Sequence, residues 1–209
     1  MLAADPAARL DALALALAAE LRPVDANAAL TRLDELAGEV REVADVTGRE
    51  LAALSTVLAE RHGLTGAAEE YDHPDHSMLD LVLERGRGLP IALSVVYVET
   101  ARRAGIALDG VGLSGHYVVG QFRDDAAPVL LDPFGGGGPI LAANPAEVRP
   151  WSPHETTLWM LNNLVGSYTR RHDLGRAIRA AEMRLELSLE PGLREALAVE
   201  LRALRARLN

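Results

Sequence analysis

Apolar residues recur at the spacing of an α-helix along the first part of the chain. The pattern predicts three helices, over residues 6–22, over residues 25–40 and over residues 49–61. Asp25 stands where a side-chain oxygen caps the start of the second helix, and Asp11 lies off the apolar stripe of the first. We therefore expect the chain to begin with a helical region.

This periodicity is lost in the next segment and then returns. Residues 63–76 contain glycine, proline and several acidic residues without an apolar repeat, which predicts a surface loop. Helices are predicted over residues 78–84 and over residues 91–104. The second is continuously apolar from Ile91 to Val98, so we expect it to be buried on most sides.

A different pattern follows, with short apolar runs separated by glycine, aspartate and proline. It predicts antiparallel strands over residues 110–113, 116–122 and 129–131, the last two joined by a hairpin at Asp124 and Asp125. The glycine run at residues 135–138 predicts a loop, because glycine loses much conformational entropy inside a regular element. Helices followed by a sheet indicate the α+β class.

Beyond Pro153 the apolar pattern is helical again as far as Leu208, with interruptions at Asp173 and Pro191. The spacing of apolar and proline positions resembles one tetratricopeptide unit followed by a capping helix. A single unit cannot bury its own apolar face, so this tail must pack on the rest of the protein or on a partner.

These patterns divide the chain into three expected parts. Residues 1–66 form an N-terminal helical region, residues 67–150 form the core that holds the sheet, and residues 151–209 form the tetratricopeptide-like tail. A chain of 209 residues is long enough to bury one sizeable core.

Composition narrows the possible partners and the compartment. The net charge of −9 argues against nucleic acid, since binding to a phosphate backbone depends on clustered lysine and arginine. No membrane span is expected, because the longest apolar run is far shorter than the roughly 20 residues needed to cross a bilayer. The chain contains no cysteine, which excludes disulfides and thiolate metal sites. Together with the absence of a secretory leader, this favours a cytoplasmic protein.

Three short motifs carry the candidate chemistry. They are Gly88-Leu89-Pro90 at the start of the apolar helix, Gly115-His116 at the start of a strand, and Leu131-Asp132-Pro133 at the end of the next. Their order resembles that of the transglutaminase-like superfamily, in which a nucleophile, a histidine and an aspartate follow one another. The resemblance implies a papain-like core of helix plus antiparallel sheet, with His116 and Asp132 in the catalytic positions.

In the same resemblance Pro90 occupies the position of the nucleophilic cysteine. Proline has no nucleophilic atom, although it is well tolerated in the first turn of a helix, where its missing N–H would have been unpaired. His116 and Asp132 are then a vestigial pair. The simpler interpretation of His116 is a core histidine bonded to a neighbour.

A closer resemblance covers nearly the whole chain. Residues 85–94, 110–116 and 131–136 are similar to bacterial transglutaminase-like proteins with a tetratricopeptide tail, a family described as regulators of SirC expression. Ser114 and Gly135 depart from the usual pattern of that family, which has proline and asparagine there. The family generally lacks the cysteine as well, so the resemblance implies a fold more firmly than an activity.

Two serines are alternative nucleophiles. Ser94 lies one helical turn beyond Pro90, which places it too deep, and a buried hydroxyl bonded to a carbonyl is the simpler interpretation. Ser114 precedes Gly115-His116, but this spacing does not by itself orient an attack.

Other charged or glycine-rich segments give weaker signals. The loop before residue 80 lacks a definite ligand spacing, so neither a metal nor another cofactor is expected there. The glycine run lacks the Lys-Ser/Thr ending of a phosphate-binding loop. Two arginines at the expected cleft entrance are of a type that binds carboxylates, although solvation is the simpler interpretation. The residues considered for a metal site are His73, His76, Glu69, Glu70, Asp72, Asp75 and Asp80. The glycine run extends from Gly135 to Gly138, and the two arginines are Arg85 and Arg87.

The sequence therefore favours a catalytically inactive transglutaminase-like protein, a pseudoenzyme that binds a peptide or protein through the cleft or the helical tail. The alternative is a cysteine-independent amidase, protease or acyltransferase in which His116 and Asp132 activate water or substrate. The oligomeric state and the identity of the partner stay open at this stage.

Overall fold

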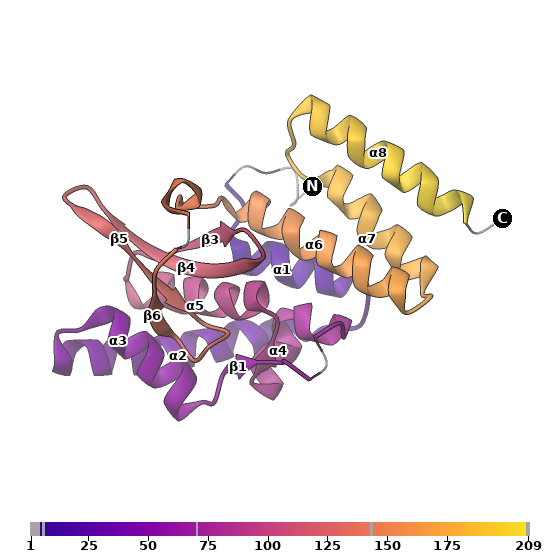
Figure 1. The fold of residues 1–209 in the computed structure, drawn as a ribbon. Coiled ribbons are helices and arrows are strands. Elements are labelled where there is room, and N and C mark those ends of the chain that lie inside the picture. The colour runs from indigo at the N-terminus through magenta and orange to yellow at the C-terminus, as the bar shows by residue number, and fades with distance from the viewer. Residues whose placement is uncertain (1–4, 6, 70, 143, 208–209) are drawn as a thin grey trace.

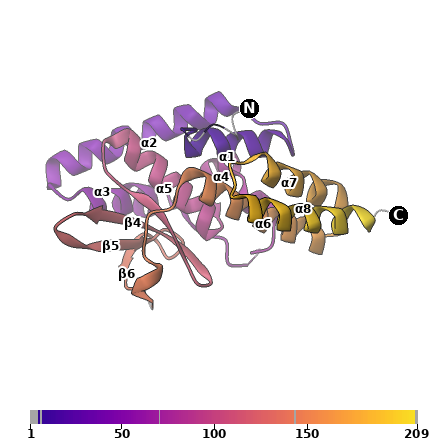
Figure 2. The same cartoon turned by 90° about the horizontal axis from the view of Figure 1, so that it is seen from above.

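The chain forms an α+β fold in which one buried helix lies between a small sheet and a layer of N-terminal helices (Figure 1). We describe a computed structural model, which covers residues 5, 7–69, 71–142 and 144–207. The C-terminal helices lie at the opposite end of the molecule from the β4–β5 hairpin (Figure 2). The expected mixed α+β class is confirmed.

The three predicted N-terminal helices are present. They are α1 (Leu10–Ala19), α2 (Ala26–Thr47) and α3 (Glu50–Ser55), the last continuing into a π-helical segment, Thr56–Arg61. Asp25 caps α2 as predicted, since its side chain accepts a hydrogen bond from the Ala28 N–H at 3.0 Å. Helix α2 continues beyond the predicted end, where Val43 and Ala44 pack against the core while the charged residues of these turns are exposed. The predicted residue Pro6 lies outside the described residues.

The segment predicted as a loop contains regular structure. It holds strand β1 (Thr65–Gly66) and a 3-10 turn, Pro74–Ser77, and it leads to helix α4 (Leu79–Arg85). After α4, strand β2 (Arg87–Gly88) pairs in parallel with β1, and helix α5 (Pro90–Ala104) follows directly. Strands of two residues are too short to give a period, so the prediction missed them.

Four antiparallel strands form the main sheet in the order β3-β4-β5-β6. The three predicted strands are β3 (Asp109–Leu113), β4 (His116–Arg123) and β5 (Ala126–Asp132), and the hairpin between β4 and β5 is where it was expected. Strand β6 (Gly138–Ile140) was not predicted. It begins at the last residue of the glycine run and contains a proline, both of which are typical of loops.

The C-terminal part consists of a 3-10 turn, Pro145–Glu147, and three helices, α6 (Pro153–Arg170), α7 (Leu174–Glu186) and α8 (Pro191–Ala206). Helix α7 packs against α6, and α8 packs against α7. Asp173 caps α7, as its side chain accepts a hydrogen bond from the Arg176 N–H at 3.0 Å. The likeness of these helices to a tetratricopeptide unit stays a prediction, and Leu208 lies outside the described residues.

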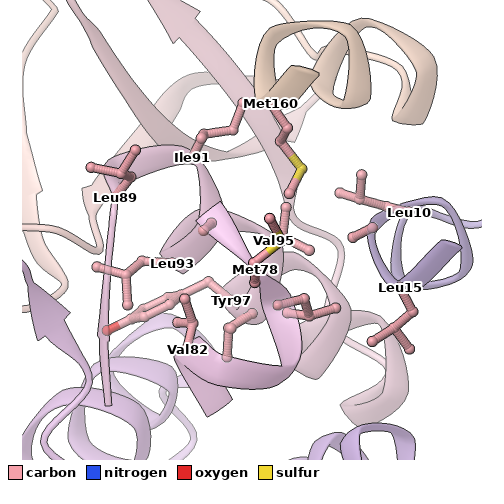
Figure 3. Packing of buried hydrophobic residues seen from close by; sticks show 14 of the residues in the cluster. Leu10, Leu15, Met78, Val82, Leu89, Ile91, Leu93, Val95, Tyr97 and Met160 are labelled. Carbon is pink, nitrogen blue, oxygen red and sulfur yellow. The ribbon is translucent and has the colours of Figure 1, made fainter. Parts of the chain in front are cut away.

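Helix α5 forms the centre of the hydrophobic core, as its apolar run predicted. Side chains of α5, including Ile91 and Val95, face Leu10 of α1 and Met160 of α6 (Figure 3). Each fully buried side chain of this size contributes about 1.5–3 kcal/mol. The core is continuous from the N-terminal helices to α6, and in the described ranges no helix is long and apolar enough to cross a membrane.

Asp11 is buried, although it lies off the apolar stripe of α1. Its carboxylate pairs with Arg103 of α5, and its backbone N–H donates to Glu99 Oε1 at 3.2 Å. Arg103 also donates to Glu99 Oε2 at 2.6 Å. Since α1 packs across α5, the charge of Asp11 is enclosed by helix partners that a single-helix pattern does not reveal.

Candidate functional site

His116 and Asp132 meet at one end of the main sheet. His116 begins β4 and Asp132 ends β5, and antiparallel pairing of these strands brings the two residues together. The distance from His116 Nε2 to Asp132 Oδ1 is 3.0 Å, and an ionised carboxylate can only accept, so Nε2 donates. Their side chains are 31% and 21% exposed, so solvent and a ligand can reach the pair. Nδ1 of His116 makes no hydrogen bond within the described part of the chain.

The Asp132 carboxylate is also held by the backbone that follows it. Phe134 N–H donates to Asp132 Oδ1 at 3.0 Å, and Gly137 N–H donates to the Asp132 carbonyl at 2.7 Å. These bonds fold the glycine run back on the end of β5. The aspartate therefore has a fixed orientation toward His116, as a positioning carboxylate requires.

Pro90 is the first residue of α5, and its ring is buried. A short series of backbone pairs links its neighbourhood to the His116–Asp132 pair. Gly88 pairs with Gly66 across β2 and β1, and Gly66 N–H donates to the Phe134 carbonyl at 3.1 Å. The start of α5 and the end of β5 are thus tied to the same two-stranded element. Whether Pro90 stands where a nucleophile would act stays a prediction.

Two aromatic rings, those of Phe134 and Tyr71, lie beside this pair. The ring of Phe134 lies 6.4 Å from that of His116 and 6.1 Å from that of Tyr71, edge to face in both cases. Gly66 makes room for Phe134, because a β-carbon there would lie 2.6 Å from the ring. Tyr71 is half exposed, so the series runs from solvent to the histidine. Phe134 belongs to a quoted motif, but nothing in the loop sequence marked Tyr71.

A buried tyrosine lies under the glycine run. Tyr97 of α5 is fully buried, and its hydroxyl has no hydrogen-bond partner among the described residues. Burial, together with the negative charges of Asp132 and Glu60, raises the pKa of Tyr97 well above its usual range. Ser55 donates to the Gly137 carbonyl at 2.6 Å and fixes the backbone above the ring. The sequence analysis did not identify Tyr97, because only the fold brings it near Asp132.

The alternative nucleophiles are not brought to the pair. Ser94 is fully buried, and its hydroxyl makes no hydrogen bond in the described structure, so the predicted bond to a carbonyl was wrong. Ser114 is exposed, and its N–H donates to Glu147 Oε2 at 2.6 Å. Neither hydroxyl contacts His116 in any hydrogen bond that the structure describes.

The acidic loop is largely neutralised by arginines. Asp72 pairs with Arg170, and the Asp75 carboxylate accepts from Arg85 at 2.7 Å. Among the described residues no cluster of three or more histidines and carboxylates is arranged to hold a metal ion, and Glu70 lies outside them. The two arginines considered for carboxylate binding are thus both used within the protein. Arg85 donates to Asp75, and Arg87 donates to the Gly66 carbonyl at 3.4 Å.

The sequence as a whole decides the family. Residues 27–151 match the sequence profile of the transglutaminase-like superfamily. The chain belongs to this superfamily. The match includes α2 and α3 as well as the sheet, so the transglutaminase-like unit extends into the N-terminal helices.

Curated relatives come from several bacteria. A UPF0162 protein of Xylella fastidiosa is 36% identical over 174 residues, which cover 74% of this chain and 61% of that protein. A UPF0162 protein of Pseudomonas aeruginosa is 38% identical over 141 residues, covering 65% of this chain and 50% of the relative. The chain thus spans about three fifths or less of the length of these relatives. No solved structure matches the chain.

Proposed function

We propose that this transglutaminase-like protein is catalytically degenerate and acts by binding a peptide or protein segment. The observation that carries the proposal is Pro90 at the start of α5, in a chain without cysteine. Covalent acyl transfer needs an activated nucleophile beside the histidine, and proline supplies neither a thiol nor a hydroxyl. The buried Ser94 and the exposed Ser114 do not replace it.

The remaining surface suits recognition of an extended segment with an apolar or aromatic side chain. Tyr71, Phe134 and His116 present successive ring edges, and aromatic pairs of this kind add about 0.5–1.5 kcal/mol each beyond the area that they bury. Helix α8 offers a second apolar surface, where Leu193 and Val199 are half exposed. We propose that the tetratricopeptide-like tail assists binding, and that the role is regulatory, as the resemblance to the SirC-related family implies.

The first test measures the capture of peptides by the protein. A displayed library of random peptides is selected on the wild-type protein, and the selected peptides are measured against Tyr71→Ala and a control, Val46→Ala. Val46 is 87% exposed at the end of α2, so the control removes an accessible apolar group elsewhere. We expect Tyr71→Ala to weaken binding about tenfold, and Val46→Ala to leave it unchanged. Equal binding by both variants would exclude the aromatic surface as the peptide-binding site.

The tail is tested with the same peptides and with any captured protein. The double variant Leu193→Asp/Val199→Asp changes only exposed positions of α8, so the fold should persist. Loss of capture in this variant, with binding retained in Tyr71→Ala, would place recognition on the tail instead of the surface formed by Tyr71, Phe134 and His116. His116→Ala should retain most of the binding, because the histidine contributes one ring edge and no catalytic step.

A second candidate function is favoured by the intact geometry of the histidine. His116 Nε2 is bonded to Asp132, and Nδ1 makes no hydrogen bond among the described residues, so this nitrogen is free to take a proton from water. A cysteine-independent hydrolase would use it in this way. Hydrolysis of amide or ester substrates by the purified protein, lost by orders of magnitude in His116→Ala, would support this function. No turnover by the wild-type protein would support the binding function.

A further inference from the structure

A hollow of about 430 Å³ lies where the C-terminal helices meet the end of α1 and the Pro74–Ser77 turn. It is lined by side chains from three distant parts of the sequence, among them Arg22, His73, Tyr168, Arg171 and Arg176. None of the residues around His116 and Asp132 takes part in it. Its volume lies in the usual range for small-molecule sites.

The hydrogen-bond donors around this hollow are incompletely used. Arg176 donates from Nη1 to Asp173 at 2.8 Å and from Nε to the Leu21 carbonyl at 3.3 Å, which leaves Nη2 free. Arg22 uses one guanidinium nitrogen on Asp80. The side chain of Arg171 makes no hydrogen bond or ion pair with any described residue, and its backbone N–H donates to the Ser167 carbonyl. The hydroxyl of Tyr168 likewise has no hydrogen-bond partner within the described ranges.

The carboxylates beside the hollow are already engaged. Asp173 caps α7 and accepts from both the backbone and the guanidinium of Arg176. Asp75 accepts from Arg85 at 2.7 Å. The three arginines that line the hollow therefore meet two carboxylates that already accept hydrogen bonds, Asp173 from Arg176 and Asp75 from Arg85. Hydrogen-bond donors therefore predominate around the hollow, although the protein as a whole has a net charge of −9.

One guanidinium of the hollow lies beside an aromatic ring. The centre of the Arg176 guanidinium lies 6.0 Å from the ring centroid of Tyr168, a cation–π arrangement. Tyr168 is itself buried, so its ring has a rigid support. Arg171 lies in the turn between α6 and α7, and Arg22 follows the end of α1. The cations thus approach the hollow from different elements.

We propose that this hollow binds a small phosphate monoester. A tetrahedral dianion has several acceptor oxygens, and arginine forks bind phosphate with two parallel hydrogen bonds. Free donors of Arg171, Arg176 and Tyr168 surround the space in which such a group would lie, and the Nε2 of His73 adds another. The bound phosphate joins the α6–α7 turn to α1 and the Pro74–Ser77 turn, and so stabilises the tail against the core.

The experiment uses calorimetry and thermal unfolding of the full chain at constant ionic strength, adjusted with sodium chloride. The probes are glycerol 3-phosphate as the monoester, inorganic phosphate as the free anion and succinate as a dicarboxylate. We expect glycerol 3-phosphate to bind with one site and to raise the melting temperature. Inorganic phosphate should bind more weakly, and succinate should bind more weakly still.

Matched variants locate the binding. Arg171→Gln should weaken the binding of glycerol 3-phosphate at least about tenfold, and Arg171→Lys should weaken this binding less because the charge remains. The control is Arg202→Gln, since Arg202 is exposed on α8 and makes no ion pair with any described residue. Tyr168→Phe, which keeps the ring, gives a second measurement if Arg171→Gln does not fold.

The proposal is overturned by absence of saturable binding, or by equal weakening in Arg171→Gln and Arg202→Gln. Tight binding of succinate would also overturn it, because the site would then be a general anion site. Inorganic phosphate that binds better than the ester would exclude the monoester. None of these results bears on peptide binding at the His116 surface, so the two proposals fail independently.

Discussion

The hydroxyl of Tyr97 lies directly beneath the backbone of Gly137. A β-carbon at position 137 would come within 2.5 Å of that hydroxyl and within 2.9 Å of Ser55 Oγ. Gly137 also has a φ of +77°, in the left-handed region that favours glycine. The glycine run is therefore required for two separate reasons at this residue, and both affect the backbone that holds Asp132.

Alanine substitutions at Gly136 and Gly137 separate the effect of the left-handed backbone from the effect of the steric clash. Gly136 has a φ of +89°, but a β-carbon there would meet nothing within 4 Å. We expect Gly136→Ala to lower the free energy of unfolding by about 1–2 kcal/mol, the cost of the left-handed conformation. Gly137→Ala should cost about 1–3 kcal/mol more, because it adds a clash in a packed site. Urea unfolding measures both, and equal losses would show that the contact with Tyr97 is unimportant.

Removal of the Tyr97 hydroxyl should stabilise the protein. This hydroxyl is buried without a hydrogen-bond partner among the described residues, and such a group costs about 1–3 kcal/mol. Tyr97→Phe should therefore raise the free energy of unfolding by about 1 kcal/mol. The matched control is Tyr117→Phe, because Tyr117 is also buried but its hydroxyl bonds to Thr156 at 2.7 Å. That change should lower stability, and a similar loss in Tyr97→Phe would contradict the prediction.

The buried Asp11 should make stability depend on pH in the acid range. Burial alone would raise the pKa of Asp11, but the hydrogen bond and charge of Arg103 outweigh it and leave the pKa lowered. The Asp11 carboxyl thus stays ionised to a lower pH in the folded protein than in the unfolded chain. The stability that Asp11 contributes is complete above the unfolded pKa of about 3.9 and is lost as the pH falls through the lower folded value.

Asp11→Asn tests this contribution. At neutral pH it should lower the free energy of unfolding by about 3 kcal/mol, as breaking one partner of a buried pair does. The difference from wild type should shrink as the pH falls below about 4. The control is Asp34→Asn, which removes an exposed partner of the same Arg103 and should cost less than about 1 kcal/mol. A pH-independent difference between wild type and Asp11→Asn would refute the assignment.

A cysteine in place of Pro90 would report whether the start of α5 faces His116. The chain has no other cysteine, so absorbance of the thiolate follows this single group. We expect the thiol in Pro90→Cys to have a pKa below the usual value of about 8.5, and adding His116→Ala should raise it. Ser94→Cys, one turn deeper and buried, should give a raised value instead. The same pKa with and without His116 would show that the two positions do not meet.

The long elements of this fold follow from sequence periodicity, whereas the short ones do not. Helix α5 and strands β4 and β5 have enough residues for a repeat to be visible. Strands β1 and β2 have two residues each, and they form because backbone groups near Gly66 and Gly88 need partners. The burial of Asp11 was also missed, because it depends on Arg103, 92 positions away.

The site divides in the same way. His116 and Asp132 were identified through a resemblance, and the structure places His116 Nε2 3.0 Å from Asp132 Oδ1. Tyr71, Tyr97 and Ser55 have no local signal, since a ring in a loop or a hydroxyl in a helix is ordinary in sequence. Their importance arises only where distant segments pack together.

The bond from Ser55 to the Gly137 carbonyl spans 82 positions of the chain. It makes the end of α3 part of the support for the glycine run, and fully buried leucines of α2 add apolar contacts to the same core. A fragment that starts after the N-terminal helices would expose these faces and release that loop. The helices that precede the sheet therefore support the backbone around His116 and Asp132, and excising the motif-bearing region alone should yield an aggregating polypeptide.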